Sequence, residues 1–87
     1  MISKKITYQG NFGPEAIALI YDITRKKEIT GFVKVVSDKQ VELDLEGDAS
    51  VIKLIQHQID RKVKTAITGK TVDPMPYQNY KGIILIK

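Results

Sequence analysis

One histidine and one row of carboxylates are the side chains best suited to acid–base or metal chemistry in this chain. His57 stands between two glutamines in a helical pattern, and these adjacent residues are neither carboxylates nor nucleophiles that could work with it. We therefore expect a solvated histidine without a catalytic role. The chain has no cysteine, which excludes a thiolate nucleophile, a disulfide and Cys-ligated zinc.

The carboxylates of Glu42, Asp44 and Glu46 alternate with aliphatic residues, as on one face of a strand. Such oxygen ligands suit Mg²⁺ or Ca²⁺. Alternate residues of a strand lie about 7 Å apart, however, too far to share one ion without help from neighbouring strands. We expect no metal site, but a solvated sheet face that pairs with lysines across the sheet. The same acidic row disfavours RNA, whose bases stack on aromatic rings in ferredoxin-like modules.

A glycine-containing segment could bind an anion at the start of the first predicted helix. It consists of Gly10, Asn11, Phe12 and Gly13. Backbone N–H groups at a helix N-terminus bind phosphate or another small anion. The alternative is a tight strand-to-helix turn, in which Glu15 interacts with the positive end of the helix dipole. Both interpretations are open at the level of sequence.

Hydrophobic periodicity gives the elements that position these groups. Alternation predicts strands over residues 4–9, 30–36 and 40–46, and the last two form a hairpin around a turn at 37–39. Aliphatic residues at helical spacing predict helices over 14–26 and 51–61. An extended segment follows at 63–72, residues 73–76 are expected to leave regular structure, and an apolar strand closes the chain at 81–87.

This order, β-α-β-β-α-β with a short extra strand, predicts an α+β ferredoxin-like sandwich, an antiparallel sheet with two helices on one face. With 87 residues and 43% hydrophobic composition, the chain can build one core, so we expect a single domain over residues 1–87. No apolar run follows the N-terminal lysines, and no stretch approaches transmembrane length. We expect a cytoplasmic protein that needs no membrane and no cofactor.

The formal charge of +4 comes mainly from lysines spread along the chain. The densest basic cluster, residues 25–27, falls at the end of the first predicted helix, where cations favour the dipole. Nucleic acid is therefore not an expected partner. Tyr77 and Tyr80 are expected to cover the sheet edge or the end of the core. Met75, between two prolines, is expected to be an exposed loop tip that could contact a protein partner beside an edge strand.

Residues 29–48 resemble the acylphosphatase family. Family members read Gly-Trp-Val-x-Asn, then a turn with Asp-Gly, then Val-Glu and an acidic Glu-Gly ending; this chain has Gly31, Phe32 and Val33, then Val41 and Glu42. Residues 76–83 are similar to the family's Pro-x-Tyr/Phe ending. Together with the element order, the resemblance covers nearly the whole chain. It implies an acylphosphatase-like fold and hydrolysis of the carboxyl-phosphate bond of acyl phosphates.

The family's catalytic motif is altered. Members carry Gly-x-Val-Gln-Gly-Val-Gly-Phe-Arg after the first strand; the loop and the arginine hold the phosphate, and the asparagine of Gly-Trp-Val-x-Asn orients the attacking water. Here the arginine position falls on Ile17, counted back from Gly31, or on Ala18, counted from Gly10, and the asparagine position falls on Val35. The resemblance therefore assigns no catalytic residue with the family's chemistry.

Three functions follow as hypotheses. The first is an inactive or severely weakened acylphosphatase-like domain that works as a binding or regulatory module. The second is an active acylphosphatase whose charge has been relocated to Lys34 or Lys5. The third is a protein-interaction module that uses an edge strand.

Overall fold

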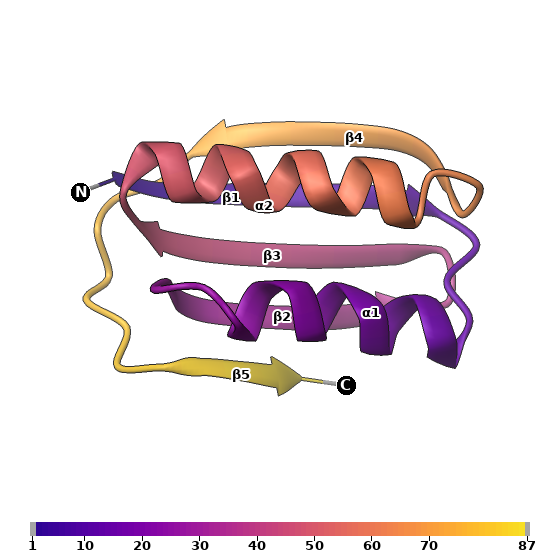
Figure 1. Cartoon of the computed structure of the whole chain (residues 1–87), viewed down its shortest axis with the longest axis horizontal. Helices are drawn as coiled ribbons and strands as arrows, with labels where there is room; N and C mark the ends of the chain where they lie inside the picture. The colour runs from indigo at the N-terminus through magenta and orange to yellow at the C-terminus, as the bar shows by residue number, and fades with distance from the viewer. Residues whose placement is uncertain (1, 87) are drawn as a thin grey trace.

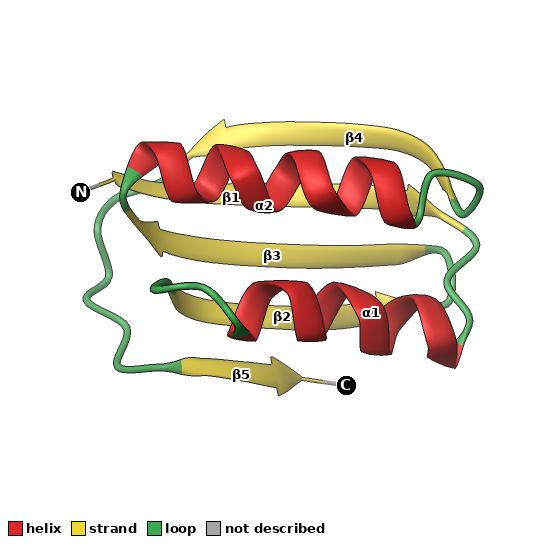
Figure 2. Ribbon diagram, in the orientation of Figure 1, coloured by secondary structure: helices red, strands yellow, loops and turns green. Residues whose placement is uncertain are grey.

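The computed structural model describes residues 2–86, and its element order confirms the predicted alternation of strands and helices (Figure 1). The elements are β1 (Ile2–Gly10), α1 (Pro14–Arg25), β2 (Thr30–Ser37), β3 (Gln40–Gly47), α2 (Ala49–Lys62), β4 (Ile67–Pro74) and β5 (Ile83–Ile86). Loops of a few residues join most of them, and the longest connection runs from β4 to β5 (Figure 2).

The sheet has the strand order β4-β1-β3-β2-β5 in the described residues. β3 pairs antiparallel with both β1 and β2, and β4 pairs antiparallel with β1. The α+β ferredoxin-like prediction is confirmed, but the sheet is mixed and not wholly antiparallel, because β5 pairs parallel with β2. After β4 the chain crosses the end of the sheet to its opposite edge, and β5 then runs in the direction of β2 (Figure 1).

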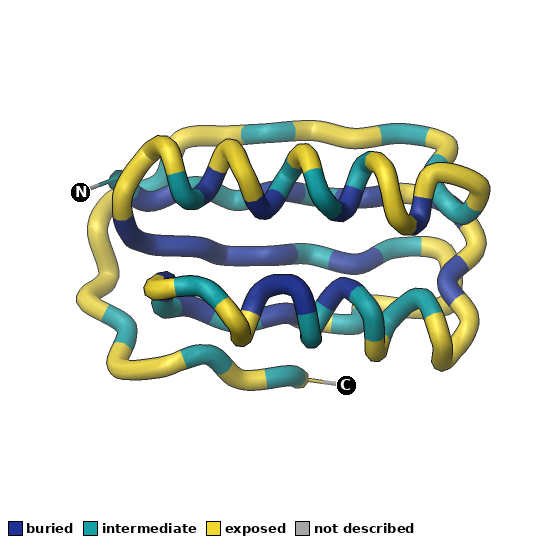
Figure 3. Tube along the Cα trace, in the orientation of Figure 1, coloured by how far each residue is buried: buried dark blue, intermediate teal, exposed yellow. Residues whose placement is uncertain are grey.

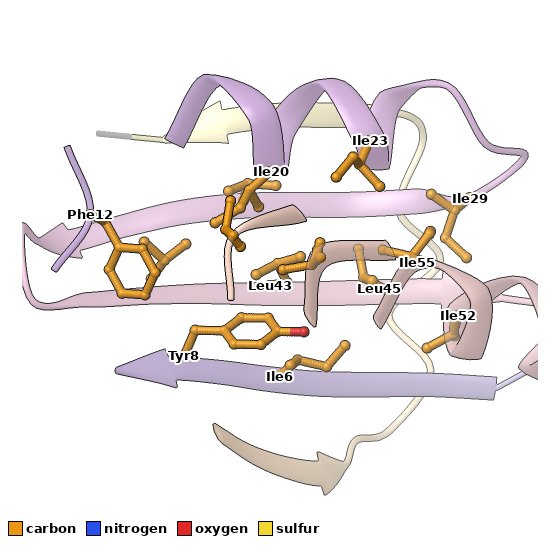
Figure 4. Close-up of a cluster of buried hydrophobic side chains, with 14 residues drawn as sticks. Ile6, Tyr8, Phe12, Ile20, Ile23, Ile29, Leu43, Leu45, Ile52 and Ile55 are labelled. Carbon is orange, nitrogen blue, oxygen red and sulfur yellow. The ribbon is translucent and has the colours of Figure 1, made fainter. Parts of the chain in front are cut away.

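Both helices lie on one face of the sheet, with α2 over β1 and β3 and α1 over β2 (Figure 1). Alternate residues of β3 point toward them and are fully buried, and each helix adds a stripe of isoleucines (Figures 3 and 4). The main contributors are Ile6, Tyr8, Ile20, Val33, Val41, Leu43, Leu45, Ile52, Ile55 and Ile59. Neither described helix is long and apolar enough to cross a membrane.

The region between α2 and β4 differs from the sequence-based expectation. Helix α2 begins after Asp48, whose side chain accepts a hydrogen bond from the Ser50 N–H, and ends only at Lys62. Residues 63–66 form a turn and not an extended segment, because the backbone N–H groups still bond to carbonyl groups three or four residues earlier. Pro74 was expected outside regular structure, but it ends β4, since this edge strand tolerates a residue without an N–H.

Candidate functional site

Backbone hydrogen bonds to two other loops hold the loop from β1 to α1 in place. The N–H groups of Gly10, Asn11 and Phe12 donate to the carbonyl oxygens of Lys39 (2.9 Å), Ala66 (2.8 Å) and Asp38 (2.7 Å). The Lys39 side chain also donates to Oδ1 of Asn11. Three N–H groups of the candidate anion-binding loop are thus already used. Anion binding by this loop stays a prediction.

Helix α1 starts with few groups that could hold an anion. Gly13 is its N-cap and makes no side-chain capping bond, Pro14 at the first position has no N–H, and the exposed Glu15 places a negative charge in the first turn. Phe12 is only 2% exposed and anchors the loop in the core (Figure 4). The loop therefore fixes the start of α1 against the sheet.

An apolar pocket lies where α1 passes over the β2 and β5 edge of the sheet. Its cavity of about 230 Å³ is lined by Pro14, Ile17, Ala18, Val35 and Leu85. Both residues considered for the family's arginine position and the residue at its asparagine position thus line the same pocket. The structure brings the three sequence-predicted positions together, and it adds two that sequence reasoning missed. Leu85 had no distinguishing signal, because all four residues of β5 are aliphatic and the sequence does not show which of them face the helices.

The two lysines considered as relocated charges lie on the other face of the sheet. Val35 pairs with Val41 on the helix-covered face, whereas Lys34 pairs with Glu42, and successive strand residues point to opposite faces. Lys5 is 3.1 Å from Glu42, and the hydrogen bond and charge of that carboxylate raise the pKa of Lys5. The structure does not bring either lysine to the pocket.

The acidic row on β3 is not the solvated face that the sequence led us to expect. Glu42 does pair with a lysine, but Asp44 is 6% exposed and Glu46 is fully buried. The connection from β4 to β5 causes this difference. The Gln78 N–H donates to one carboxylate oxygen of Glu46, and the Tyr80 N–H donates to the other at 2.9 Å. Burial alone would raise the pKa of Glu46, but these backbone hydrogen bonds outweigh it and the pKa is lowered.

Tyr80 covers the acidic face of the sheet, and not the sheet edge or the end of the core as the sequence led us to expect, while Tyr77 is 52% exposed. Its hydroxyl lies 3.4 Å from Oδ2 of Asp44, and its ring packs edge-to-face on Phe32 with centroids 5.6 Å apart. Burial raises the pKa of Asp44 and also that of Tyr80.

The Met75 N–H donates to the Ser3 carbonyl at 3.0 Å, and Met75 is half-buried, not the exposed tip that we predicted. Residues 75–82 thus form a strap, which we call the β4–β5 strap.

Other candidates remain outside any site. His57 is exposed on α2, as predicted. Tyr8 points into the core and not toward the acidic face, and its hydroxyl donates to Asp60 at 3.2 Å while Lys70 pairs with the same carboxylate at 2.7 Å. Within residues 2–86, no three acidic or histidine side chains are arranged to hold a metal ion. The exposed Arg25 forms an ion pair with Asp22 at the end of α1.

Comparison with known proteins identifies the fold. No family model matches the chain, and no curated protein matches it in sequence. Among solved structures, an acylphosphatase from Bacillus subtilis superposes with a TM-score of 0.87 at 17% identity, covering 100% of both chains. Full-length HypF in the phosphate- and nucleotide-bound form gives a TM-score of 0.87 at 18% identity, over 99% of this chain and 12% of that one.

A bacterial light-regulated adenylyl cyclase is more distant, with a TM-score of 0.66 at 14% identity over 99% of this chain and 27% of that one. Identities this low establish the arrangement of the backbone, not its chemistry. The strand order, the two helices on one face and the superposition over the whole chain show that this protein has the acylphosphatase-like, ferredoxin-like fold.

Proposed function

We propose that this chain is a single, non-catalytic acylphosphatase-like domain that works as a binding or regulatory module in the cytoplasm. The observation that carries the proposal is the lining of the pocket. The positions that the resemblance assigns to the phosphate-binding arginine and the water-orienting asparagine hold Ile17 or Ala18, and Val35. An acyl phosphate needs hydrogen-bond donors and positive charge at these points, and aliphatic side chains supply neither.

The expected loss of rate is large. Removing one preorganised donor to a developing charge commonly costs about 10²–10³ in rate, and two such groups, the arginine and the asparagine, are replaced here. The loop adds nothing to replace them, because the N–H groups of Gly10, Asn11 and Phe12 donate to backbone carbonyls. Glu15 would also repel a phosphate at the start of α1.

Modular use of the fold in other proteins supports a binding or regulatory role. In HypF and in the light-regulated adenylyl cyclase, the matched part takes up only 12% and 27% of the chain. The same fold can therefore serve as one module among others in a longer protein. The apolar pocket gives this domain a place to bind a side chain or a small apolar group.

Hydrolysis of benzoyl phosphate by the purified protein, measured against buffer alone, tests the proposal. We expect no rate above the buffer value for the wild type. Ile17→Arg with Val35→Asn, and Ala18→Arg with Val35→Asn, restore the family's groups under the two alignments, and a gain in either variant identifies the correct one. Val36→Asn, an exposed position on the same strand, is the matched control and should gain nothing.

Robust hydrolysis by the wild type would refute the proposal. Lys34→Ala and Lys5→Ala would then test the hypothesis of a relocated charge, since loss of turnover in one variant would identify the lysine responsible. Thermal unfolding of each variant establishes that a silent protein is folded.

A further inference from the structure

The two edges of the sheet are protected very differently. The β4 edge carries Lys70, Asp73 and Pro74, which are typical of an edge that avoids pairing with another chain. The β5 edge is the run Ile83–Ile86, four branched aliphatic residues without a charge or a proline. Ile84 is 57% exposed and Ile86 is 36% exposed. The β5 edge is therefore open to pairing with an extended segment.

The register of β5 shows which backbone groups are available. The Gly31 N–H donates to the Gly82 carbonyl at 2.8 Å, and β5 runs parallel to β2. In a parallel ladder, alternate residues direct both backbone groups to the same neighbour. Gly82, Ile84 and Ile86 therefore face β2, whereas Ile83 and Leu85 direct their N–H and carbonyl groups outward. An added strand would find two donors and two acceptors there.

The apolar pocket adjoins this same edge. Leu85 lies on the helix-covered face, where it lines the pocket together with Ile17, Ala18 and Val35. The cavity of about 230 Å³ is smaller than the roughly 300–1,000 Å³ typical of sites for drug-sized ligands. It suits one aliphatic or aromatic side chain. A strand beside β5 would place alternate side chains toward the pocket face, as in other cases of strand addition.

Two lysines near the ends of β5 define the charge of the occupant. Lys34 pairs with Ile86 in the sheet, and Lys81 stands shortly before the strand. Both are exposed, and neither forms an ion pair within residues 2–86. A second copy paired antiparallel with β5 would bring Lys81 of one molecule near Lys34 of the other, and like charges disfavour that pairing. Acidic side chains complement both positions.

We propose that β5 and the apolar pocket bind an extended, acidic segment of a partner protein, which adds a strand to the sheet and inserts one apolar side chain into the pocket. This inference rests on the proposed function, because a side chain of the partner would occupy the apolar pocket in which an active acylphosphatase would bind its substrate. Main-chain hydrogen bonds to Ile83 and Leu85 would hold the segment, the pocket would select the apolar residue, and Lys34 and Lys81 would select the acidic flanks.

NMR titration with a synthetic peptide tests the proposal. The probe is a peptide of about six residues that alternates aspartate with isoleucine, blocked at both ends. We expect saturable shifts of the backbone amides of β5 and of Ala18. A peptide with lysine in place of aspartate should bind about tenfold more weakly or worse, because it meets the two lysines.

Variants at exposed positions sharpen the test. Ala18→Trp fills the pocket and should weaken binding at least about tenfold, and Lys34→Glu with Lys81→Glu should do the same. Lys53→Glu, an exposed lysine on α2, is the matched charge reversal and should leave affinity unchanged. Equal affinity for all variants would overturn the proposal.

Two further outcomes would also overturn it. One is the absence of shifts in β5 at millimolar peptide. The other is the appearance of β5 shifts when the protein alone is concentrated, with dimers in analytical ultracentrifugation, since the occupant would then be a second copy. Hydrolysis and binding are independent readouts. Benzoyl phosphate turnover refutes the proposed function, whereas a failed titration in a protein without turnover refutes only the choice of partner.

Discussion

Replacing Glu46 by glutamine should release the β4–β5 strap without changing the shape of the side chain. The carboxylate offers one oxygen to each of two backbone donors, the N–H groups of Gln78 and Tyr80. A glutamine has one carbonyl oxygen and one NH₂ group, so one donor would face another donor. The lost bond is charge-assisted and roughly twice as strong as a neutral one. Local opening of the strap should therefore become on the order of 10- to 100-fold more frequent.

Amide hydrogen exchange followed by NMR measures this opening directly. In Glu46→Gln we expect faster exchange at Gln78 and Tyr80, with little change in the β1 and β3 amides. Glu42→Gln is the matched control: it lies on the same face of β3, but its carboxylate pairs with the Lys5 side chain, a partner outside the strap. Unchanged exchange at Tyr80 in Glu46→Gln would refute the view that this carboxylate holds the strap.

The pH dependence of the strap follows from the lowered pKa of Glu46. A carboxyl group whose pKa is lower in the folded state stabilises the fold fully above its unfolded pKa, about 4.3 for glutamate. The contribution is lost as pH falls through the folded value. The wild type should therefore lose strap protection in acid, and Glu46→Gln should show a flatter profile. A wild-type profile as flat as that of the variant would contradict this assignment.

Three further results are expected. In Gly31→Ala, a Cβ would stand 1.7 Å from the Asp44 carbonyl oxygen at a φ of +137°, so the Tm should fall by more than about 12 °C, while Gly13→Ala, with open space around it, should melt near the wild type. Asp44→Asn removes a carboxylate whose pKa burial raises, so the variant should melt above the wild type at neutral pH and lose that advantage as pH falls below the raised pKa. Tyr8→Phe removes the hydroxyl bond to Asp60 and should lower the free energy of unfolding by about 1 kcal/mol in a denaturant titration.

The fold could be predicted from the sequence because its signals are local. The alternation of Val41, Leu43 and Leu45 gives a half-buried strand, and the structure places all three in the core. Pro14 marks the start of α1 as predicted. Two predictions were wrong. Residues 63–66 form a turn because helix-type hydrogen bonds continue beyond the apolar stripe of α2, and Pro74 belongs to β4 because an edge strand tolerates proline.

The burial of Asp44 and Glu46 could not be predicted from the same pattern. An alternating strand distinguishes an apolar face from a polar one, but it does not say what covers the polar face. The cover comes from the strap, more than 30 residues later in the chain, through backbone N–H groups that every non-proline residue carries. A backbone N–H donor does not depend on the residue type, so this contact has no local signal in the sequence.

The candidate site depends on far fewer residues than the fold does. The backbone path that places α1 across the β2–β5 edge is set by many core residues, and it persists at 17% identity with a TM-score of 0.87. The pocket beneath α1 is lined by only a few side chains, among them Ile17, Ala18 and Val35. Apolar side chains offer a phosphate neither a hydrogen-bond donor nor a positive charge. If the proposed function is correct, a few substitutions at these positions are enough to change the chemistry of the pocket while the fold stays the same.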